Sequence, residues 1–205
     1  MNKYITSDYV VSALANLPQL VFEVTDACNL RCKYCAYGEF YEDYDCRENK
    51  MLSTEKAIRL IDYLAKYWNS NLNTSTDKNI TISFYGGEPL LNFPFVEAVV
   101  RHIKNNVHCP HRRFSFSMTT NAMLLHKYMD FLQENNFHLL ISLDGNKEND
   151  GYRMDKAGHS SFERVVTNVD MLRDKYPDYF LRYVNFNAVL HNRNSVESIY
   201  RFFKE

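Results

Sequence analysis

Three cysteines near the start of the chain are the residues whose type and spacing point most directly to chemistry. Cys28, Cys32 and Cys35 stand in the order CxxxCxxC within eight residues. Thiolates are the standard ligands of iron–sulfur clusters. Three thiolates on a four-iron cluster leave one iron open, and an open iron can bind and activate a second molecule. The spacing therefore predicts a 4Fe–4S cluster held by these three residues.

A zinc site is the alternative for the same cysteines. A closed structural zinc site takes four ligands, typically from two CxxC or CxxH pairs. Only Cys46 or a distant histidine remains in the sequence to complete such a site. We therefore favour the cluster. We expect Cys46 and Cys109 to be ordinary free thiols, because an unligated cysteine behaves as a small hydrophobic residue.

A second motif carries groups suited to holding a ligand. Gly86, Gly87, Glu88 and Pro89 form the sequence GGEP directly after a predicted strand. Two glycines allow the backbone to approach a ligand closely, and the carboxylate adds a hydrogen-bond acceptor. Taken alone, the glycine pair is equally consistent with a simple turn between a strand and a helix.

A third group of polar residues follows a later predicted strand. The stretch SLDG places Ser142 and Asp144 at the end of that strand, and Arg153 comes shortly after it. A guanidinium is suited to pairing with a carboxylate, so this group can hold an acidic ligand. The alternatives are that Asp144 only forms a turn with its following glycine and that Arg153 is a surface residue.

The elements that must position these motifs alternate along the chain. Strands are predicted at 20–24, 80–85, 114–119, 138–143 and 181–190, and helices at 54–68, 95–105, 124–134, 161–175 and 195–203, the first helix capped by Ser53. This alternation predicts an α/β fold with a parallel sheet and right-handed crossovers. About five βα units fit an open or partial (β/α) barrel, in which ligands bind beyond the carboxyl ends of the strands. The motifs follow the predicted strands and therefore fall at that edge.

Together, the motifs resemble the radical S-adenosylmethionine (radical SAM) superfamily. Its members carry CxxxCxxC after the first strand of a (β/α) barrel, and the residues between Cys28 and Cys35 are similar to those of its peptide-modifying branch. The resemblance implies that the open iron binds the amine and carboxylate of S-adenosylmethionine. It also implies one-electron cleavage of the sulfonium, which yields a 5′-deoxyadenosyl radical that abstracts a hydrogen atom from the substrate.

The same resemblance implies roles for the other motif residues. The backbone of Tyr34 is expected to face the adenine, and the GGEP backbone and Glu88 are expected to hold the methionine ammonium. Ser142 and Asp144 are expected to bond the ribose hydroxyls or the carboxylate. Arg153 is expected to pair with the methionine carboxylate.

Two further positions carry a weaker resemblance. Thr120-Asn121-Ala122 is similar to a T-N-G element after the third strand, with alanine in place of the usual glycine. Asn121 is expected either to face the substrate or to cap the next helix. Val189 and Leu190 are candidates for the adenine pocket, with packing in the core as the alternative.

The spacing of the motifs resembles anaerobic sulfatase-maturating enzymes and radical SAM peptide maturases, over about residues 20–194. This resemblance implies a peptide or protein substrate and an electron donor such as a flavodoxin or ferredoxin. Relatives of this branch usually carry a cysteine-rich C-terminal extension, whereas no cysteine follows Cys109.

We therefore expect an N-terminal extension over residues 1–18 and a radical SAM core domain over 19–205, without the C-terminal part of the barrel and the auxiliary-cluster domain. A non-catalytic metal-binding or interaction module that keeps the fold, with zinc or no metal, is the alternative function.

Composition limits the classes of partner. The chain of 205 residues has 24 Lys and Arg against 25 Asp and Glu, a net charge of −1. This balance gives no general attraction to nucleic acid or to an anionic membrane, so we expect neither as a partner. The N-terminal residues lack the apolar run and cleavage site of a signal peptide, and no stretch of ~18 apolar residues predicts a membrane span. A cytoplasmic location, where thiols stay reduced, is expected.

Overall fold

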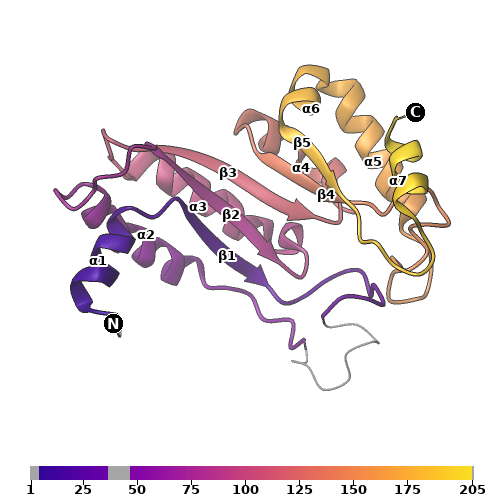
Figure 1. The fold of residues 1–205 in the computed structure, drawn as a ribbon, viewed down its shortest axis with the longest axis horizontal. Coiled ribbons are helices and arrows are strands. Elements are labelled where there is room, and N and C mark those ends of the chain that lie inside the picture. Colours follow the sequence, from indigo (N-terminus) through magenta and orange to yellow (C-terminus); the bar gives the residue numbers. More distant parts are fainter. Residues whose placement is uncertain (1–4, 37–46, 205) are drawn as a thin grey trace.

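Five parallel strands form one sheet in the computed structural model, which describes residues 5–36 and 47–204. The strands are β1 (Gln19–Thr25), β2 (Asn79–Gly86), β3 (Arg113–Thr120), β4 (His138–Ser142) and β5 (Val184–Asn187). They lie side by side in chain order, and every neighbouring pair is parallel (Figure 1). The predicted α/β fold of about five βα units, arranged as a partial barrel, is confirmed.

Helices connect the strands. They are α1 (Ser7–Ala15), α2 (Thr54–Trp68), the short 3₁₀ helix η1 (Pro89–Asn92), α3 (Phe93–Asn106), α4 (Leu125–Glu134), α5 (Phe162–Lys175), α6 (Pro177–Tyr183) and α7 (Val196–Lys204). The bounds of α2 agree with the prediction, and the Ser53 hydroxyl caps it by accepting a hydrogen bond from the Lys56 N–H at 3.4 Å. Within the described parts of the chain, no helix is both long and apolar enough to cross a lipid bilayer.

The two faces of the sheet differ in polarity. Side chains alternate between the faces along each strand, so in β2 the buried Ile80, Ile82 and Phe84 share the face that packs against the helices. Ser83 lies on the other face and shares a hydrogen bond of 2.6 Å with the Ser117 hydroxyl of β3. Parallel strands are usually apolar on both faces. The alternation here leaves one face polar and open.

The fifth strand is shorter than predicted. Residues 181–183 of the predicted strand 181–190 are helical, as the last turn of α6, and pairing with β4 extends only over Val184–Asn187. Pro177 begins α6, and its fixed φ favours the first turn of a helix. Tyr179 anchors this helix, because its ring is buried and its hydroxyl donates to the Phe137 carbonyl oxygen at 2.6 Å.

The segment before β1 contains a helix that was not predicted. Helix α1 packs beside α2, and the Thr6 hydroxyl caps its N-terminus by accepting from the Tyr9 N–H. At its other end, the Ala15 carbonyl oxygen accepts a hydrogen bond of 2.9 Å from the buried Arg112 guanidinium. These contacts attach the N-terminal segment to the core.

Candidate functional site

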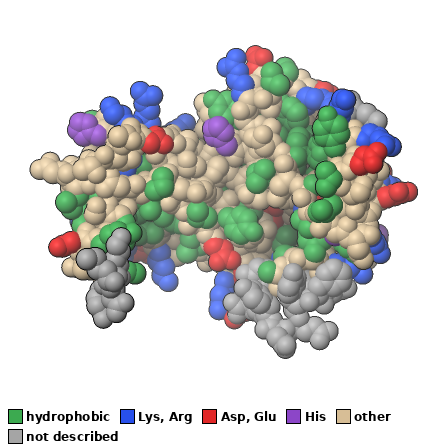
Figure 2. All heavy atoms as spheres, viewed as in Figure 1, with side chains coloured by type: hydrophobic (Ala, Val, Ile, Leu, Met, Phe, Trp, Pro, Cys, Tyr) green, Lys and Arg blue, Asp and Glu red, His purple; other side chains and the backbone are tan. Residues whose placement is uncertain are grey.

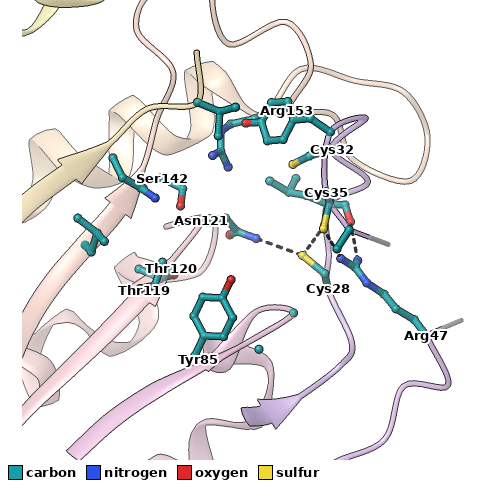
Figure 3. Close-up of a pocket in the computed structure, with 18 of the residues that line it drawn as sticks. Cys28, Cys32, Cys35, Arg47, Tyr85, Thr119, Thr120, Asn121, Ser142 and Arg153 are labelled. Carbon is teal, nitrogen blue, oxygen red and sulfur yellow. Dashed lines mark hydrogen bonds between the residues drawn. The ribbon is translucent and has the colours of Figure 1, made fainter. Parts of the chain in front are cut away.

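A cavity of about 540 Å³ opens at the carboxyl ends of the strands. This volume lies in the range of small-molecule and cofactor sites. Three groups of predicted residues build its wall. Cys28, Cys32, Tyr34 and Cys35 follow β1, Gly86 and Gly87 stand at the end of β2, and Ser142 and Arg153 come from β4 and the loop that follows it. In Figure 3 the three cysteines, Ser142 and Arg153 surround the same space, which Tyr85 enters from the sheet below.

The loop that carries the cysteines is held by a second loop. The Arg31 N–H donates to the Met154 carbonyl oxygen at 2.7 Å, and the Lys33 N–H donates to the Tyr152 carbonyl oxygen at 3.2 Å. The side chain of Leu30 is only 1% exposed and anchors the loop in the interior. This pairing fixes the backbone on both sides of Cys32 and brings the segment that contains Arg153 beside the cysteines.

Hydrogen-bond donors point at two of the three sulfurs. The Cys28 Sγ accepts from the Leu30 N–H at 3.4 Å and from the Asn121 amide at 3.6 Å, and the Cys35 Sγ accepts from the Arg47 guanidinium at 3.0 Å. Burial raises the pKa of the Cys28 thiol and raises that of Cys32 to about 12. The Cys28 and Cys32 thiols are therefore protonated at neutral pH, and metal binding has to displace these protons. Once Cys28 and Cys35 are thiolates, the donors in place stabilise their negative charge.

The donor set fits a cluster better than a single ion. Over residues 5–36 and 47–204, no three His, Cys, Asp or Glu side chains gather around one point closely enough to hold a metal ion. Three cysteines on a four-iron cluster each bind a different iron, so their sulfurs stand further apart than the ligands of one ion. Cys46 lies outside the described residues, and Cys109 is buried as a free thiol away from the cavity, between α3 and β3.

The glycine pair is required by the close approach of two backbones. A Cβ on Gly86 would lie 2.3 Å from the Thr25 carbonyl oxygen, and one on Gly87 would lie 2.0 Å from the Ala27 carbonyl oxygen. The Gly87 N–H donates to Thr25 at 2.7 Å, and the Glu88 N–H donates to Ala27 at 2.8 Å. The turn after β2 is thereby pressed against the start of the cysteine loop.

Glu88 lies behind the cavity wall. Its side chain is fully buried and accepts hydrogen bonds from the Thr120 hydroxyl at 2.7 Å, the Asn121 N–H at 2.7 Å and the Leu90 N–H at 3.1 Å. Burial raises the pKa of Glu88, and these three donors act against that shift. The carboxylate therefore ties the turn after β2 to the end of β3, while Pro89 begins η1 and is buried.

Asp144 also lies behind the wall, where it holds two cavity residues. It is fully buried, and its carboxylate accepts hydrogen bonds from the Tyr34 hydroxyl and, at 2.9 Å, from the Val189 N–H. The Nε of Arg153 lies 3.3 Å from its Oδ2. Arg153 itself lines the cavity, and its guanidinium carbon lies 5.6 Å from the centroid of the Tyr34 ring.

Arg153 remains charged in this setting. Burial by itself lowers the pKa of the guanidinium, but the ionisable groups of Tyr34 and Asp144 outweigh that effect and raise it. Ser142 lines the cavity beside it, at the end of β4.

The weaker candidates divide between the cavity and its surroundings. Asn121 lines the cavity. Its Oδ1 accepts a hydrogen bond from the Met123 N–H, and because Met123 precedes the first residue of α4, Asn121 does not cap that helix. Ala122 adopts a φ of 59°, a conformation that favours glycine, at the position where the resembling motif has one. Val189 lines the cavity, whereas Leu190 is 60% exposed and lies outside its wall.

Several cavity residues were not predicted. Tyr85, Thr119 and Asn187 line it from the open face of the sheet, and the alternation of polar and apolar residues along their strands is the signal that would have found them. Arg47 also lines the cavity. It comes from the segment between β1 and α2, and no local pattern in the sequence reports its contact with Cys35.

Comparison with known proteins relates the chain to enzymes of one superfamily. A cysteine-type anaerobic sulfatase-maturating enzyme of Clostridium novyi is 32% identical over 196 residues, which cover 94% of this chain and 49% of the relative. The radical SAM cyclopropyl synthase TigE of Paramaledivibacter caminithermalis is 27% identical over 82% of this chain and 34% of its own length. The chain thus spans about half the length of the first relative, or less in the case of the second.

A solved structure agrees with the fold. The structure described as native anSMEcpe with bound AdoMet and Cp18Cys peptide superposes with a TM-score of 0.73 at 24% identity, covering 92% of this chain and 48% of the other. At this identity the agreement concerns the fold alone. The family model described as the radical SAM superfamily matches residues 22–204, which include the cysteine loop and every strand after the start of β1. On this match, the chain belongs to the radical SAM superfamily.

Proposed function

We propose that the chain binds a 4Fe–4S cluster through Cys28, Cys32 and Cys35 and binds S-adenosylmethionine in the adjoining cavity, as the core of an enzyme that abstracts hydrogen from a peptide or protein during its maturation. The observation that supports this most strongly is the convergence of three thiols, a glycine turn and a buried guanidinium on one cavity. Bound in this way, the cluster supplies the electron that cleaves S-adenosylmethionine.

The residues of the cavity take distinct roles in this proposal. Arg153 pairs with the methionine carboxylate. Its Nε faces the buried carboxylates of Asp144 and Asp150, whereas the end of its guanidinium reaches the cavity in Figure 3. The backbone at Gly86 and Gly87 lies next to the methionine ammonium, and Glu88 holds that turn in place from behind. Ser142 bonds a ribose hydroxyl.

The adenine end of the ligand lies between the cysteine loop and the segment after β5. Tyr34 presents its backbone there, and Asp144 fixes its side chain through the hydroxyl. Leu190 lies outside the wall, so Val189 is the residue of that pair that we place beside the adenine.

The substrate is proposed from the relatives. The matched enzymes include sulfatase-maturating enzymes, and the superposed structure carries a peptide together with AdoMet. The open sheet face below the cavity carries the hydroxyls of Ser83, Ser117 and Thr119, which can hydrogen-bond to a peptide backbone, together with the carboxylate of Glu23. A flavodoxin or ferredoxin is the class of donor that delivers single electrons to such a cluster.

Anaerobic reconstitution tests the proposal. We expect about four iron and four sulfide per chain, together with an electron paramagnetic resonance spectrum of the reduced cluster that changes when S-adenosylmethionine is added. Replacing Cys28, Cys32 and Cys35 together by Ala should abolish iron uptake, whereas Cys109→Ala should retain it as a matched control. Full iron content in the triple variant would show that the cluster is held elsewhere.

A further inference from the structure

Arg47 connects two points of the cysteine loop. Its Nη2 donates to the Cys35 Sγ at 3.0 Å, and its Nη1 donates to the Leu30 carbonyl oxygen at 3.4 Å. Figure 3 shows the Arg47 side chain at the edge of the cavity, reaching toward Cys35. The two contacts lie on either side of Cys32 in sequence, so one guanidinium spans most of the segment that carries the thiols.

The environment of Cys35 differs from that of Cys28. The donors to the Cys28 Sγ are a backbone N–H at 3.4 Å and the amide of Asn121 at 3.6 Å, both of them neutral. Arg47 carries a permanent positive charge, and it is also closer to its sulfur. A hydrogen bond from a charged donor is about twice as strong as one from a neutral donor. Of these contacts, the one at Cys35 is therefore the strongest.

We propose that Arg47 is a positioning residue that holds Cys35 and raises the reduction potential of the cluster, an inference that rests on the proposed function. Reduction adds one electron, taken from an electron-donor protein, and increases the negative charge on the cluster and its sulfur ligands. Hydrogen bonds to these sulfurs are among the factors that set the potential of iron–sulfur clusters. A charged donor at Cys35 stabilises the reduced form more than the oxidised form, and no covalent bond at Arg47 forms or breaks.

The test is a redox titration of the reconstituted full chain, followed by electron paramagnetic resonance. Arg47→Met removes the donor and its charge and replaces the guanidinium by a flexible, unbranched apolar side chain. We expect it to retain its iron and to shift the one-electron equilibrium at least tenfold toward the oxidised cluster, which lowers the potential by about 59 mV or more.

Arg31→Met is the matched control. It removes the same charge from the same loop, but the Arg31 side chain is exposed and contacts no cysteine within the described part of the chain. Because solvent and salt screen an exposed charge, we expect a shift of less than about threefold. Arg47→Lys keeps the charge and loses the two-point contact, so its potential should lie between those of the wild type and Arg47→Met.

The outcomes separate the inference from the proposed function. An unchanged potential in Arg47→Met, or equal shifts in Arg47→Met and Arg31→Met, would overturn the role of Arg47. If Arg47→Met takes up no iron, Arg47→Lys decides, and a wild-type potential there would also overturn it. Failure of the wild-type chain to take up iron would contradict the proposed function itself.

Discussion

Two carboxylates share one guanidinium behind the cavity wall. The Nε of Arg153 lies 3.3 Å from Asp144 Oδ2 and 3.6 Å from Asp150 Oδ1, and all three side chains are at least nine-tenths buried. Asp144 accepts hydrogen bonds from the Tyr34 hydroxyl and the Val189 N–H. Asp150 accepts hydrogen bonds from the Asp144 N–H at 3.1 Å and the Ser161 hydroxyl at 3.4 Å, yet burial outweighs them and raises its pKa to about 7. Two buried anions beside one cation favour protonation of one of them.

Replacing Asp150 by Asn should therefore change how stability depends on pH. The unfolded carboxyl has an ordinary pKa of 3.8, so the folded state binds the proton more tightly between about pH 4 and pH 7. The free energy of unfolding of the wild type should then fall across that window and level off above it. Asn resembles the protonated carboxyl at every pH, so the variant should lack this contribution.

The measurement is urea denaturation of both proteins at pH 5 and pH 8. We expect Asp150→Asn to gain about 2.7 kcal/mol relative to the wild type between these values, since the folded carboxyl with its pKa of about 7 titrates over about two pH units of this range and one pKa unit corresponds to about 1.4 kcal/mol. When the free energies of unfolding of the two proteins are subtracted at each pH, the contributions of all other titrating groups cancel. A constant difference across this range would mean that Asp150 is ionised throughout.

At the level of single residues, the sequence predicted which residues lie at the site better than it predicted where their side chains point. The spacing of Cys28, Cys32 and Cys35 was sufficient to place all three thiols at one cavity. The carboxylates of Glu88 and Asp144 were expected to contact a ligand, yet both point behind the wall. Their partners are donors on β3 and on the segment after β5, and such contacts depend on the tertiary arrangement of strands that are distant in the sequence.

The site depends on contacts between three loops. The turn after β2 presses against the start of the cysteine loop at Thr25 and Ala27, and the 152–154 segment pairs with the same loop at Arg31 and Lys33. Each contact uses backbone atoms, so it specifies position without requiring a particular side chain. The glycine pair is the exception, because any Cβ there would overlap a carbonyl oxygen.

Gly87→Ala should disrupt the site through this overlap. Its Cβ would stand 2.0 Å from the Ala27 carbonyl oxygen, so one of the two backbones has to move. We expect iron uptake to fall and the affinity for S-adenosylmethionine to drop at least tenfold, about 1.4 kcal/mol, as measured by iron analysis and equilibrium binding.

Gly158→Ala is the control for this variant. Gly158 has a φ of +84°, but no atom lies within 4 Å of the Cβ position. It should cost about 1 kcal/mol of stability from backbone strain alone and leave binding intact. Wild-type binding by Gly87→Ala would show that the close approach is not needed.

The elements were predictable where periodicity was strong. The 3.6-residue period of α2 gave its bounds correctly, because Ala57, Ile61, Leu64 and Trp68 mark one buried face. The fifth strand was overestimated, because a run of aromatic and β-branched residues also fits a helix that starts at a proline. Helix α1 was missed because only Ala15 of its residues is buried, which leaves little apolar pattern to detect.

Across the whole molecule, one face of the sheet contributes to stability and the other contributes to binding. One face carries the aromatic core, in which the Phe84 ring centroid lies 5.7 Å from that of Phe137 and 6.4 Å from those of Phe22 and Phe95. The opposite face carries hydroxyls and Tyr85, and it continues into the cavity. In Figure 2 charged side chains lie mainly around the rim, while uncharged and hydrophobic ones cover the middle of the face in view.

Two adjacent residues of β2 test this division. Phe84 is 1% exposed on the core face, and Tyr85 is 55% exposed on the open face. We expect Phe84→Ala to lower the free energy of unfolding by about 3–5 kcal/mol, because it removes a buried ring and leaves a cavity among aromatic neighbours. Tyr85→Ala should change it by less than about 1 kcal/mol, since its largely exposed ring contributes little to the core.

The same pair should behave in the opposite way in binding experiments. Tyr85 lines the cavity beside Gly86 and Thr119, so Tyr85→Ala should alter the spectrum of the S-adenosylmethionine complex. Phe84→Ala should retain the wild-type spectrum at temperatures at which it remains folded, because its side chain faces the helices. Denaturation curves and resonance spectra of the two variants provide the measurement.

Equal losses of stability in both variants would mean that the open face is part of the folding core. The two faces of the sheet would then not have separate roles.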